Sequence, residues 1–418
     1  MSCINTPARR LAAYAVFGAA LAPCLSSATD GYFSTGYGIR SRGMAGASIA
    51  LPLDATAAAN NPAGMVWVDR RWDASLELFA PYRHYTIDGA PSGMGGFFPG
   101  TVYSGENFFV MPTFGMNFPQ KDGSAIGVTL DGNGGMNTTW PSDANGGYGT
   151  FGAGKTGVNL EQAFLAVSYS RKFDERSSWG ASVIYGFQRF QAKGLQGFNP
   201  SSSNISNNGV DTSQGFGFKV GVQSEIRPGL TVGAVYSPKM KMERFDKYSD
   251  LFADHGNFDI PENYGVGLAY RPNDRSVLAF DVKQINYSDV TSVGNPGASS
   301  YPLGDPNGPG FGWKDMTVYK LGYQWQARPD LQLRAGVSYG RQPIRSTDVL
   351  FNILAPGVQE WHFTGGFTKT LKDGGEFSMA VVYSPSKTVS GPNPMDPAQT
   401  IKLSMHQYEL EFGYSKKF

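Results

Sequence analysis

The sequence predicts an all-β protein, a 14-stranded antiparallel transmembrane β-barrel with an N-terminal hatch, or plug, inside its lumen. Fourteen segments alternate apolar and polar residues with period two, as half-buried strands do. The connections between these segments are long and short in turn. The 418 residues include 54 glycines and 13% aromatic residues but only 17% charged residues, and after residue 25 no apolar run approaches the ~20 residues of a membrane-spanning helix.

The charge balance and the composition argue against several other classes of protein. The chain has 35 Lys and Arg against 34 Asp and Glu, so it carries no basic field for a nucleic-acid backbone. The excess of glycine and aromatic residues is unlike that of a helical enzyme or a coiled coil.

Residues 1–28 predict a secretory signal peptide. Arg9 and Arg10 precede an apolar stretch at 11–22, and a small-x-small cleavage site ends at Ala28. Cleavage removes both cysteines, so the exported chain has no disulfide framework. The alternative is a lipoprotein signal ending at Cys24, which the preceding proline fits poorly.

The last strand shows the alternation most clearly. His406, Tyr408, Leu410, Phe412 and Tyr414 share one face, with mostly polar residues on the other. Equivalent strands are expected at 72–87, 108–118, 124–131, 161–172, 177–190, 215–225, 229–237, 263–271, 276–286, 315–326, 330–340, 359–370, 376–384 and 404–418.

The connections indicate the architecture. Short, turn-like connections fall at 119–124, 174–177, 226–229, 271–275, 327–330 and 372–375. Long ones fall at 88–107, 132–160, 191–214, 238–262, 287–314, 341–358 and 385–403. This regular alternation is typical of outer-membrane barrels, which have short periplasmic turns and long external loops. A closed sheet also satisfies every backbone polar group in hydrocarbon.

Two prolines conflict with regular strands. Pro81 and Pro112 lie inside the first two expected strands, where a proline removes a ladder hydrogen bond. Either these strands are interrupted there or their boundaries differ from those given above.

Residues 29–71 do not alternate and are rich in glycine and alanine, whereas 72–418 form the expected barrel. A fourteen-stranded barrel is wider than one that its own side chains fill. A compact segment of small residues is therefore expected to plug the lumen. The alternative is a disordered periplasmic tail, which the apolar residues Leu51, Leu53 and Trp67 disfavour.

Particular motifs in this segment carry a resemblance to a known family. They are the run GMAGA at 43–47, Asp54, the motif Asn61-Pro62-Ala63-Gly64 before the first strand, and the terminal Phe418. With the strand count and loop alternation, the chain resembles the FadL/TodX outer-membrane transporters of long-chain fatty acids and aromatic hydrocarbons over essentially its whole mature length.

The resemblance implies a monomeric barrel in the outer membrane of a Gram-negative bacterium, with a hatch and a kinked third strand. It implies passive uptake of hydrophobic compounds, captured among the outer loops, bound in the lumen and released sideways through the wall at the kink. The implied partners are a hydrophobic small molecule, outer-membrane lipid and lipopolysaccharide, and the barrel assembly machinery, which would recognise Phe418. No cofactor is implied.

Candidate site residues follow from the same picture. Gly132, Gly134 and Gly135 suit a lateral opening at the end of the third strand, because they disfavour a regular ladder. The alternative is the start of the long loop at 132. Of the inward-facing cations, Lys219, Lys320 and Arg334 are candidates to hold a carboxylate.

Apolar residues in the outer loops are candidates for substrate capture. The spacing of Phe245, Tyr248 and Leu251 predicts one face of a short helix over the barrel mouth. Packing of that face on a neighbouring loop is the alternative. The candidates are Leu195, Phe198, Met242, Phe245, Tyr248, Leu251 and Phe252.

Signals for catalysis are weak. The four histidines lack metal-ligand spacing and no Gly-x-Ser-x-Gly motif is present. We therefore expect no enzyme, no metal and no nucleic-acid partner. The rival functions are a general diffusion porin for polar solutes and, less favoured, a barrel enzyme such as a lipase.

Overall fold

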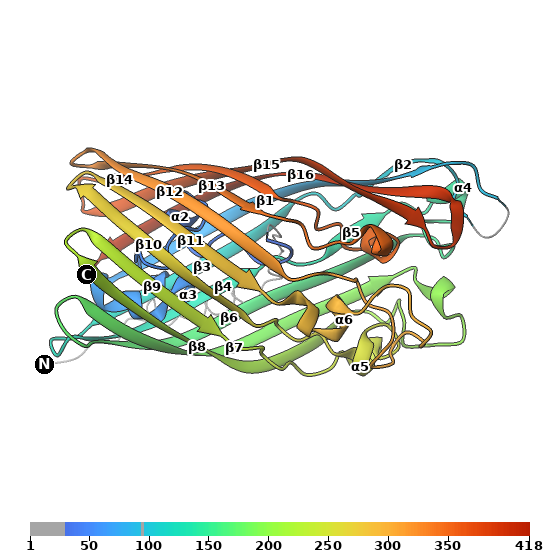
Figure 1. Ribbon diagram of the computed structural model, residues 1–418, viewed down its shortest axis with the longest axis horizontal. Helices are drawn as coiled ribbons and strands as arrows, with labels where there is room; N and C mark the ends of the chain where they lie inside the picture. Colours follow the sequence, from blue (N-terminus) through green and yellow to red (C-terminus); the bar gives the residue numbers. More distant parts are fainter. Residues whose placement is uncertain (1–29, 93–95) are drawn as a thin grey trace, which may run out of the picture.

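The computed structural model describes residues 30–92 and 96–418, and within them fourteen strands close into an antiparallel barrel (Figure 1). The predicted signal peptide lies outside the described residues. Closure comes from β1 and β16, which pair from Arg71↔Lys417 to Asp88↔Thr400. The barrel strands are β1 (Arg71–Asp88), β3 (Phe109–Pro119), β4 (Ser124–Asn133), β6 (Thr156–Lys172), β7 (Ser177–Lys193), β8 (Asp211–Arg227), β9 (Leu230–Ser237), β10 (Asn263–Asn273), β11 (Ser276–Ile285), β12 (Met316–Arg328), β13 (Leu331–Gly340), β14 (Trp361–Thr370), β15 (Gly375–Asn393) and β16 (Asp396–Lys417). The predicted fold class is confirmed.

The two ends of the barrel differ as the connections predict. Tight turns lie at the end that holds the C-terminus, and the long connections with their short helices lie at the other end (Figure 1). Two short strands extend the wall there, β2 (Gly100–Tyr103) on β1 and β5 (Asn137–Trp140) on β6. The helical turns at this end are α4 (Ala144–Gly147), η2 (Gln196–Phe198), η3 (Asp246–Tyr248), α5 (Ala253–Gly256), η4 (Tyr287–Asp289), α6 (Thr291–Gly294), η5 (Ser346–Asp348) and η6 (Phe351–Ile353). No helix in the described part of the chain is long and apolar enough to cross a membrane.

One expected long connection, 385–403, is wrong. β15 and β16 continue as a paired hairpin to Asn393↔Asp396. The register shifts between Ser384 and Lys387, and Pro385 lies in that irregularity. Above the membrane neither face of a strand borders lipid, so the alternation that marks a strand fades although the pairing continues.

Residues 30–70, here called the lumen segment, lie inside the barrel and are mostly buried. They contain α2 (Ile39–Arg42), α3 (Ala57–Asn60) and the 3₁₀ helix η1 (Pro62–Trp67). Glycines on the inner wall let this backbone approach closely. A Cβ on Gly180 would lie 2.5 Å from the carbonyl carbon of Pro62, and one on Gly336 would lie 2.4 Å from that of Met44.

Candidate functional site

A cavity lies between the lumen segment and the inner wall. The cavity volume, taken as the space open to the centre of a water-sized sphere, is about 80 Å³. One water needs ~10–15 Å³ on this measure, so the cavity has room for several. Its lining mixes apolar and charged side chains. Representative residues are Phe33, Tyr37 and Ile49 from the lumen segment and Asp131, Phe164 and Lys283 from the wall.

Two of the three candidate cations line this cavity and are already engaged. Lys219 donates to the carbonyl of Ala59, and Lys320 lies 2.9 Å from a carboxylate oxygen of Asp30. Arg334 does not line the cavity. It donates to Gln324, Gln332 and Thr368, with distances of 2.6 to 2.8 Å.

Lys283 differs from these cations. Its Nζ lies 4.9 Å from the ring centre of Phe33 and 5.8 Å from that of Tyr37, and it donates no hydrogen bond to any residue in 30–92 or 96–418. Asp131 and Asp281 share the cavity, so the lining is close to charge balance. Strand parity places Lys283 in the lumen, but only the tertiary structure shows that it has no hydrogen-bond or ion-pair partner among the described residues.

The wall is interrupted beside this cavity. β3 and β4 pair from Pro119↔Ala125 to Phe114↔Leu130 and then stop. β3 continues to pair with β1 as far as Phe109, and β4 continues to pair with β6 as far as Asn133. Residues 109–113 and 131–133 therefore border each other without a ladder.

The two prolines that conflict with regular strands lie beside this interruption. Pro112 pairs with Leu76 of β1 but has no ladder partner on β4. Pro81 pairs with Gln407 at a level where the ladder with β3 has already ended. Proline is tolerated where one edge of a strand is unpaired. Pro112 was thus a sequence signal for an open edge here.

The candidate glycines occupy two different settings. Gly132 is in the ladder opposite Ala163, and a Cβ there would lie 3.0 Å from the carbonyl oxygen of Gln162. Gly134 and Gly135 lie between β4 and β5. Asn133 lies opposite Gln162 of β6, and Asn137 lies opposite Asn159. The chain between β4 and β5 therefore takes four residue steps where β6 takes three. One extra residue on one strand defines a β-bulge.

A chain of hydrogen bonds joins the lumen segment to the outer loops across this part of the wall. The hydroxyl of Tyr37 donates to Asn133 Oδ1 at 2.5 Å, and Asn133 donates to Gln162 at 3.3 Å. Gln162 donates to Gln188 at 3.1 Å, and Gln188 donates to the carbonyl of Phe258 at 2.9 Å. Burial raises the pKa of Tyr37 well above its ordinary value, so its hydroxyl stays protonated and can donate. Sequence pattern alone does not reveal this chain, because its members lie on separate strands and connections.

The Asn-Pro-Ala-Gly motif ties the lumen segment to the wall. Asn61 donates to the carbonyls of Ile49 at 2.8 Å and Val222 at 3.2 Å, and it accepts from the backbone of Ala63. The carbonyl of Ala63 accepts from Ser178 at 2.7 Å. Pro62 begins η1, and a Cβ on Gly64 would meet Pro52 at 2.8 Å.

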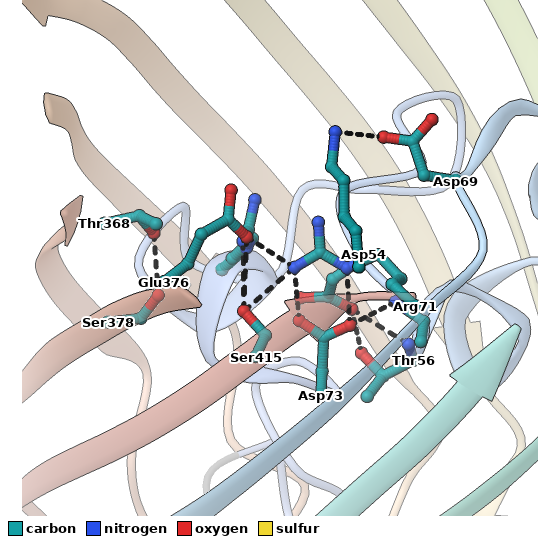
Figure 2. A network of polar contacts seen from close by, with 12 residues as sticks. Asp54, Thr56, Asp69, Arg71, Asp73, Thr368, Glu376, Ser378 and Ser415 are labelled. Atoms are coloured by element: carbon teal, nitrogen blue, oxygen red, sulfur yellow. Dashed lines mark hydrogen bonds and ion pairs between the residues drawn. The ribbon is translucent and has the colours of Figure 1, made fainter. Parts of the chain in front are cut away.

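Ion pairs hold the same segment near the end of the barrel with tight turns. Figure 2 shows Arg71 between Asp73 and Glu376, each at 2.7 Å. Arg40 also pairs with Glu376, and Asp73 accepts from the backbone of Ala55 at 2.9 Å. Burial, together with the nearby Asp73, raises the pKa of Asp54, which accepts from Thr56.

A second, apolar pocket lies among the outer loops. It is lined by Val158, Phe190, Leu251, Phe252, Phe311, Phe351 and Leu354, among others. The ring of Phe198 lies 5.1 Å from that of Phe351 and packs at the edge of the same cluster.

Other capture candidates are packed away from this pocket. Leu195, Phe245 and Tyr248 are fully buried, and Met242 lies beside Gly215 of the wall. The expected short helix is not formed. η3 is a single turn, and Asp254 and His255 in α5 have φ values of 53° and 55°. This run of turns packs Phe245 and Tyr248 around Phe190, so it carries no continuous helical face.

Comparisons with known proteins agree with this architecture. Residues 28–390 match the family model described as outer membrane protein transport protein (OMPP1/FadL/TodX). The toluene transporter TodX of Pseudomonas putida is 19% identical, with a TM-score of 0.66 and coverage of 95% of this chain and 100% of that chain. A Pseudomonas aeruginosa FadL homologue is 17% identical, with a TM-score of 0.68 and coverage of 93% and 100%.

The toluene transporter TbuX of Ralstonia pickettii is similar at a TM-score of 0.62, with 16% identity and coverage of 92% of this chain and 99% of that chain. No curated protein matches the sequence. The structural likeness supports the fold, and the family model spans most of the sequence. The chain therefore belongs to the OMPP1/FadL/TodX family of outer membrane transport proteins.

Proposed function

We propose that this outer-membrane protein takes up hydrophobic compounds, long-chain fatty acids or hydrocarbons, by passive diffusion. One observation carries the proposal: the lumen cavity reaches Asp131 and Asn133 on β4, where the pairing of β4 with β3 has ended. A ligand in the cavity therefore lies next to a part of the wall that has no ladder to break. The similar solved structures are those of toluene transporters and of a FadL homologue.

Capture begins among the outer loops in this proposal. Leu251 and Phe252 line the apolar pocket there, and Phe198 packs at its edge. An apolar solute gains free energy by leaving water for such a surface. Phe245 and Tyr248 support this surface by packing on Phe190, which lines the pocket, and Leu195 and Met242 are buried in the same apolar cluster.

Binding in the lumen follows. A carboxylate head entering the cavity would meet the ammonium of Lys283, since Lys219 and Lys320 already donate to the lumen segment. A neutral hydrocarbon would instead use the rings of Phe33 and Phe164. A contact with Lys283 would thus distinguish a fatty acid from a neutral hydrocarbon.

Exit is lateral, through the wall between β3 and β4, with Gly134 and Gly135 in the adjoining bulge. The lumen segment acts as the hatch, held by Asn61 and by the pairs of Arg40 and Arg71. The ligand would then enter the apolar core of the membrane without first crossing water. The proposal needs no cofactor and no catalytic step.

The remaining partners are proposed on the same basis. Phe418, which is half exposed beside Phe118, is offered to the barrel assembly machinery. A monomer is proposed, because β1 and β16 complete the barrel without a strand from a second chain. Outer-membrane lipid surrounds the outward apolar side chains.

The proposal is tested in proteoliposomes and in cells. Purified protein should give little swelling with sugars, while cells that express it should take up a hydrophobic compound faster than cells without it. Mass spectrometry of ligand released from the purified protein should identify an apolar or amphipathic molecule. Rapid swelling with sugars and no gain in hydrophobic uptake would instead support a general diffusion porin.

A further inference from the structure

A groove of about 730 Å³ lies on the outside of the barrel, above the lipid-facing part of β12 and β13. Tyr319 and Tyr339 form its lower edge and face outward, and the ring of Trp361 lies 4.7 Å from that of Tyr339. Below them the outward side chains are apolar, such as Leu321. Aromatic residues at this position mark the boundary between hydrocarbon and headgroups.

Three cations line the groove just beyond this boundary. Arg341 directly follows the end of β13 and lies two residues beyond Tyr339, about 7 Å farther along at ~3.3 Å per residue. Lys314 and Arg345 lie in the connections on either side. The groove is therefore basic at the level of the lipid headgroups in the outer leaflet.

These cations have no anionic partner. Across the described ranges 30–92 and 96–418, the side chains of Lys314 and Arg341 make no hydrogen bond or ion pair, and Arg345 Nε is buried without a partner. Some other cations at this end are paired, as Lys387 is with Glu360 at 2.7 Å. Lys402 pairs with Asp88 in the same way. A buried donor left without an acceptor is costly, so an anion bound in the groove would stabilise Arg345.

The nearby carboxylates do not fill this role. Asp315 lines the groove but accepts from the backbone and hydroxyl of Ser288, at 2.9 and 2.7 Å. Asp348 accepts from the backbone of Gly297 at 2.6 Å. Glu360 accepts from Lys387 and from the backbone of Gln342. Three cations against one engaged carboxylate leave the groove with excess positive charge.

We infer that this groove binds a phosphorylated glycolipid of the outer leaflet. Arg341 and Arg345 can each hold a phosphate through two parallel N–H groups, and Lys314 adds a third charge. The acyl chains of the same molecule lie along the apolar face below Tyr319. A free phosphate ion would gain nothing from that face, so the surface fits a lipid better. This site is separate from the substrate path, which runs inside the barrel.

The test uses the mature chain, purified in detergent free of lipopolysaccharide and titrated while its intrinsic tryptophan fluorescence is followed. The probes are lipopolysaccharide with intact lipid A phosphates, the same material after enzymatic dephosphorylation, and inorganic phosphate. The variant is Lys314→Ala/Arg341→Ala/Arg345→Ala. The control variant Lys121→Ala/Arg176→Ala/Lys372→Ala removes equal charge from exposed turns at the opposite end.

The wild type and the control should bind intact lipopolysaccharide alike, and the groove variant should bind roughly 10-fold more weakly, the scale of one or two charge-assisted contacts. Dephosphorylated material should bind the wild type as weakly as intact material binds the variant. Equal binding of intact lipopolysaccharide by the wild type and the groove variant, or equal binding of intact and dephosphorylated material by the wild type, would overturn the inference in favour of the apolar band alone. Full displacement by millimolar phosphate would overturn it in favour of a free-anion site.

If the triple variant fails to give a heat-modifiable band on gels, Arg341→Ala alone takes its place, because that side chain is exposed. It should weaken binding of intact lipopolysaccharide about threefold, on the scale of a single exposed charged contact, and leave dephosphorylated binding unchanged. No difference between Arg341→Ala and the wild type would count against the groove.

Discussion

Replacing Tyr37 with phenylalanine should loosen the lumen segment from the wall. The substitution keeps the ring beside Lys219 and Lys283, at 5.7 and 5.8 Å, and removes the hydroxyl that donates to Asn133 at 2.5 Å. The two hydrogen bonds between the backbone of Tyr37 and Asn60 are unaffected. The change therefore isolates one contact between the lumen segment and the end of β4.

The magnitude follows from the burial of Asn133, which is 2% exposed. A buried acceptor that loses its donor costs ~1–3 kcal/mol, and a neutral hydrogen bond replaced by water costs ~0.5–1.5 kcal/mol. The cavity beside Asn133 has room for water, so we expect a value near ~1.4 kcal/mol, where the two ranges meet. That value shifts the ratio of displaced to seated lumen segment by about tenfold.

Ion current through single channels in planar bilayers measures this ratio. Tyr37→Phe should raise the fraction of time spent conducting about tenfold relative to the wild type. Tyr85→Phe is the matched control, because the buried hydroxyl of Tyr85 bonds to Thr150 at 3.0 Å, away from the lumen segment. Since burial raises the pKa of Tyr37, this contribution should be constant from neutral pH to about pH 9.

The two variants should lower the temperature of unfolding to a similar extent, and only Tyr37→Phe should change the current. If both lose stability alike and neither changes the conducting fraction, the contact with Asn133 supports the fold without holding the lumen segment closed. The reasoning about the hatch would then be refuted at this contact.

Three further predictions address the hatch, the exit and the substrate. Deleting residues 30–65 should leave a heat-modifiable barrel whose single-channel conductance is high and nonspecific, and an unchanged conductance would exclude a plug. The double variant Gly134→Val/Gly135→Val should slow uptake of a hydrophobic compound in cells, because β-branched residues restore strand pairing. Binding of the compound by the purified variant should stay near that of the wild type. If the variant still supports full uptake in cells, the exit lies elsewhere. Lys283→Met should weaken binding of a fatty acid roughly 10-fold and leave toluene binding unchanged, as judged by calorimetry; equal effects on both ligands would argue against a carboxylate contact.

Much of the fold could be predicted from the sequence, and particular segments show why. The strand at 404–418 alternates because one face borders lipid and the other borders the lumen, and this constraint acts on every residue of the span. Where the constraint ends, as in the hairpin above Ser384, the prediction failed although pairing continues.

The candidate site was predicted less completely. Pro112 signalled an unpaired edge of β3, and Gly134 and Gly135 signalled a bulge. Helical spacing at 245–252 predicted a face that the structure does not form, because short turns pack those rings inward. Periodicity indicates which face of an element is apolar, but it does not identify the residues that this face contacts.

The sequence by itself determined the strand number, the inward or outward direction of each strand residue and the presence of a small-residue segment before the barrel. These are local properties, since period-two alternation and turn composition act over a few residues. Only the tertiary structure decided that Lys320 is held by Asp30, 290 residues away, while Lys283 contacts aromatic rings and donates no hydrogen bond to any described residue. It also decided that Tyr37 reaches Asn133 and that β3 and β4 separate after Leu130. Closing the barrel brings distant strands around one lumen segment, and which side chains meet there depends on register and tilt, which local pattern does not specify.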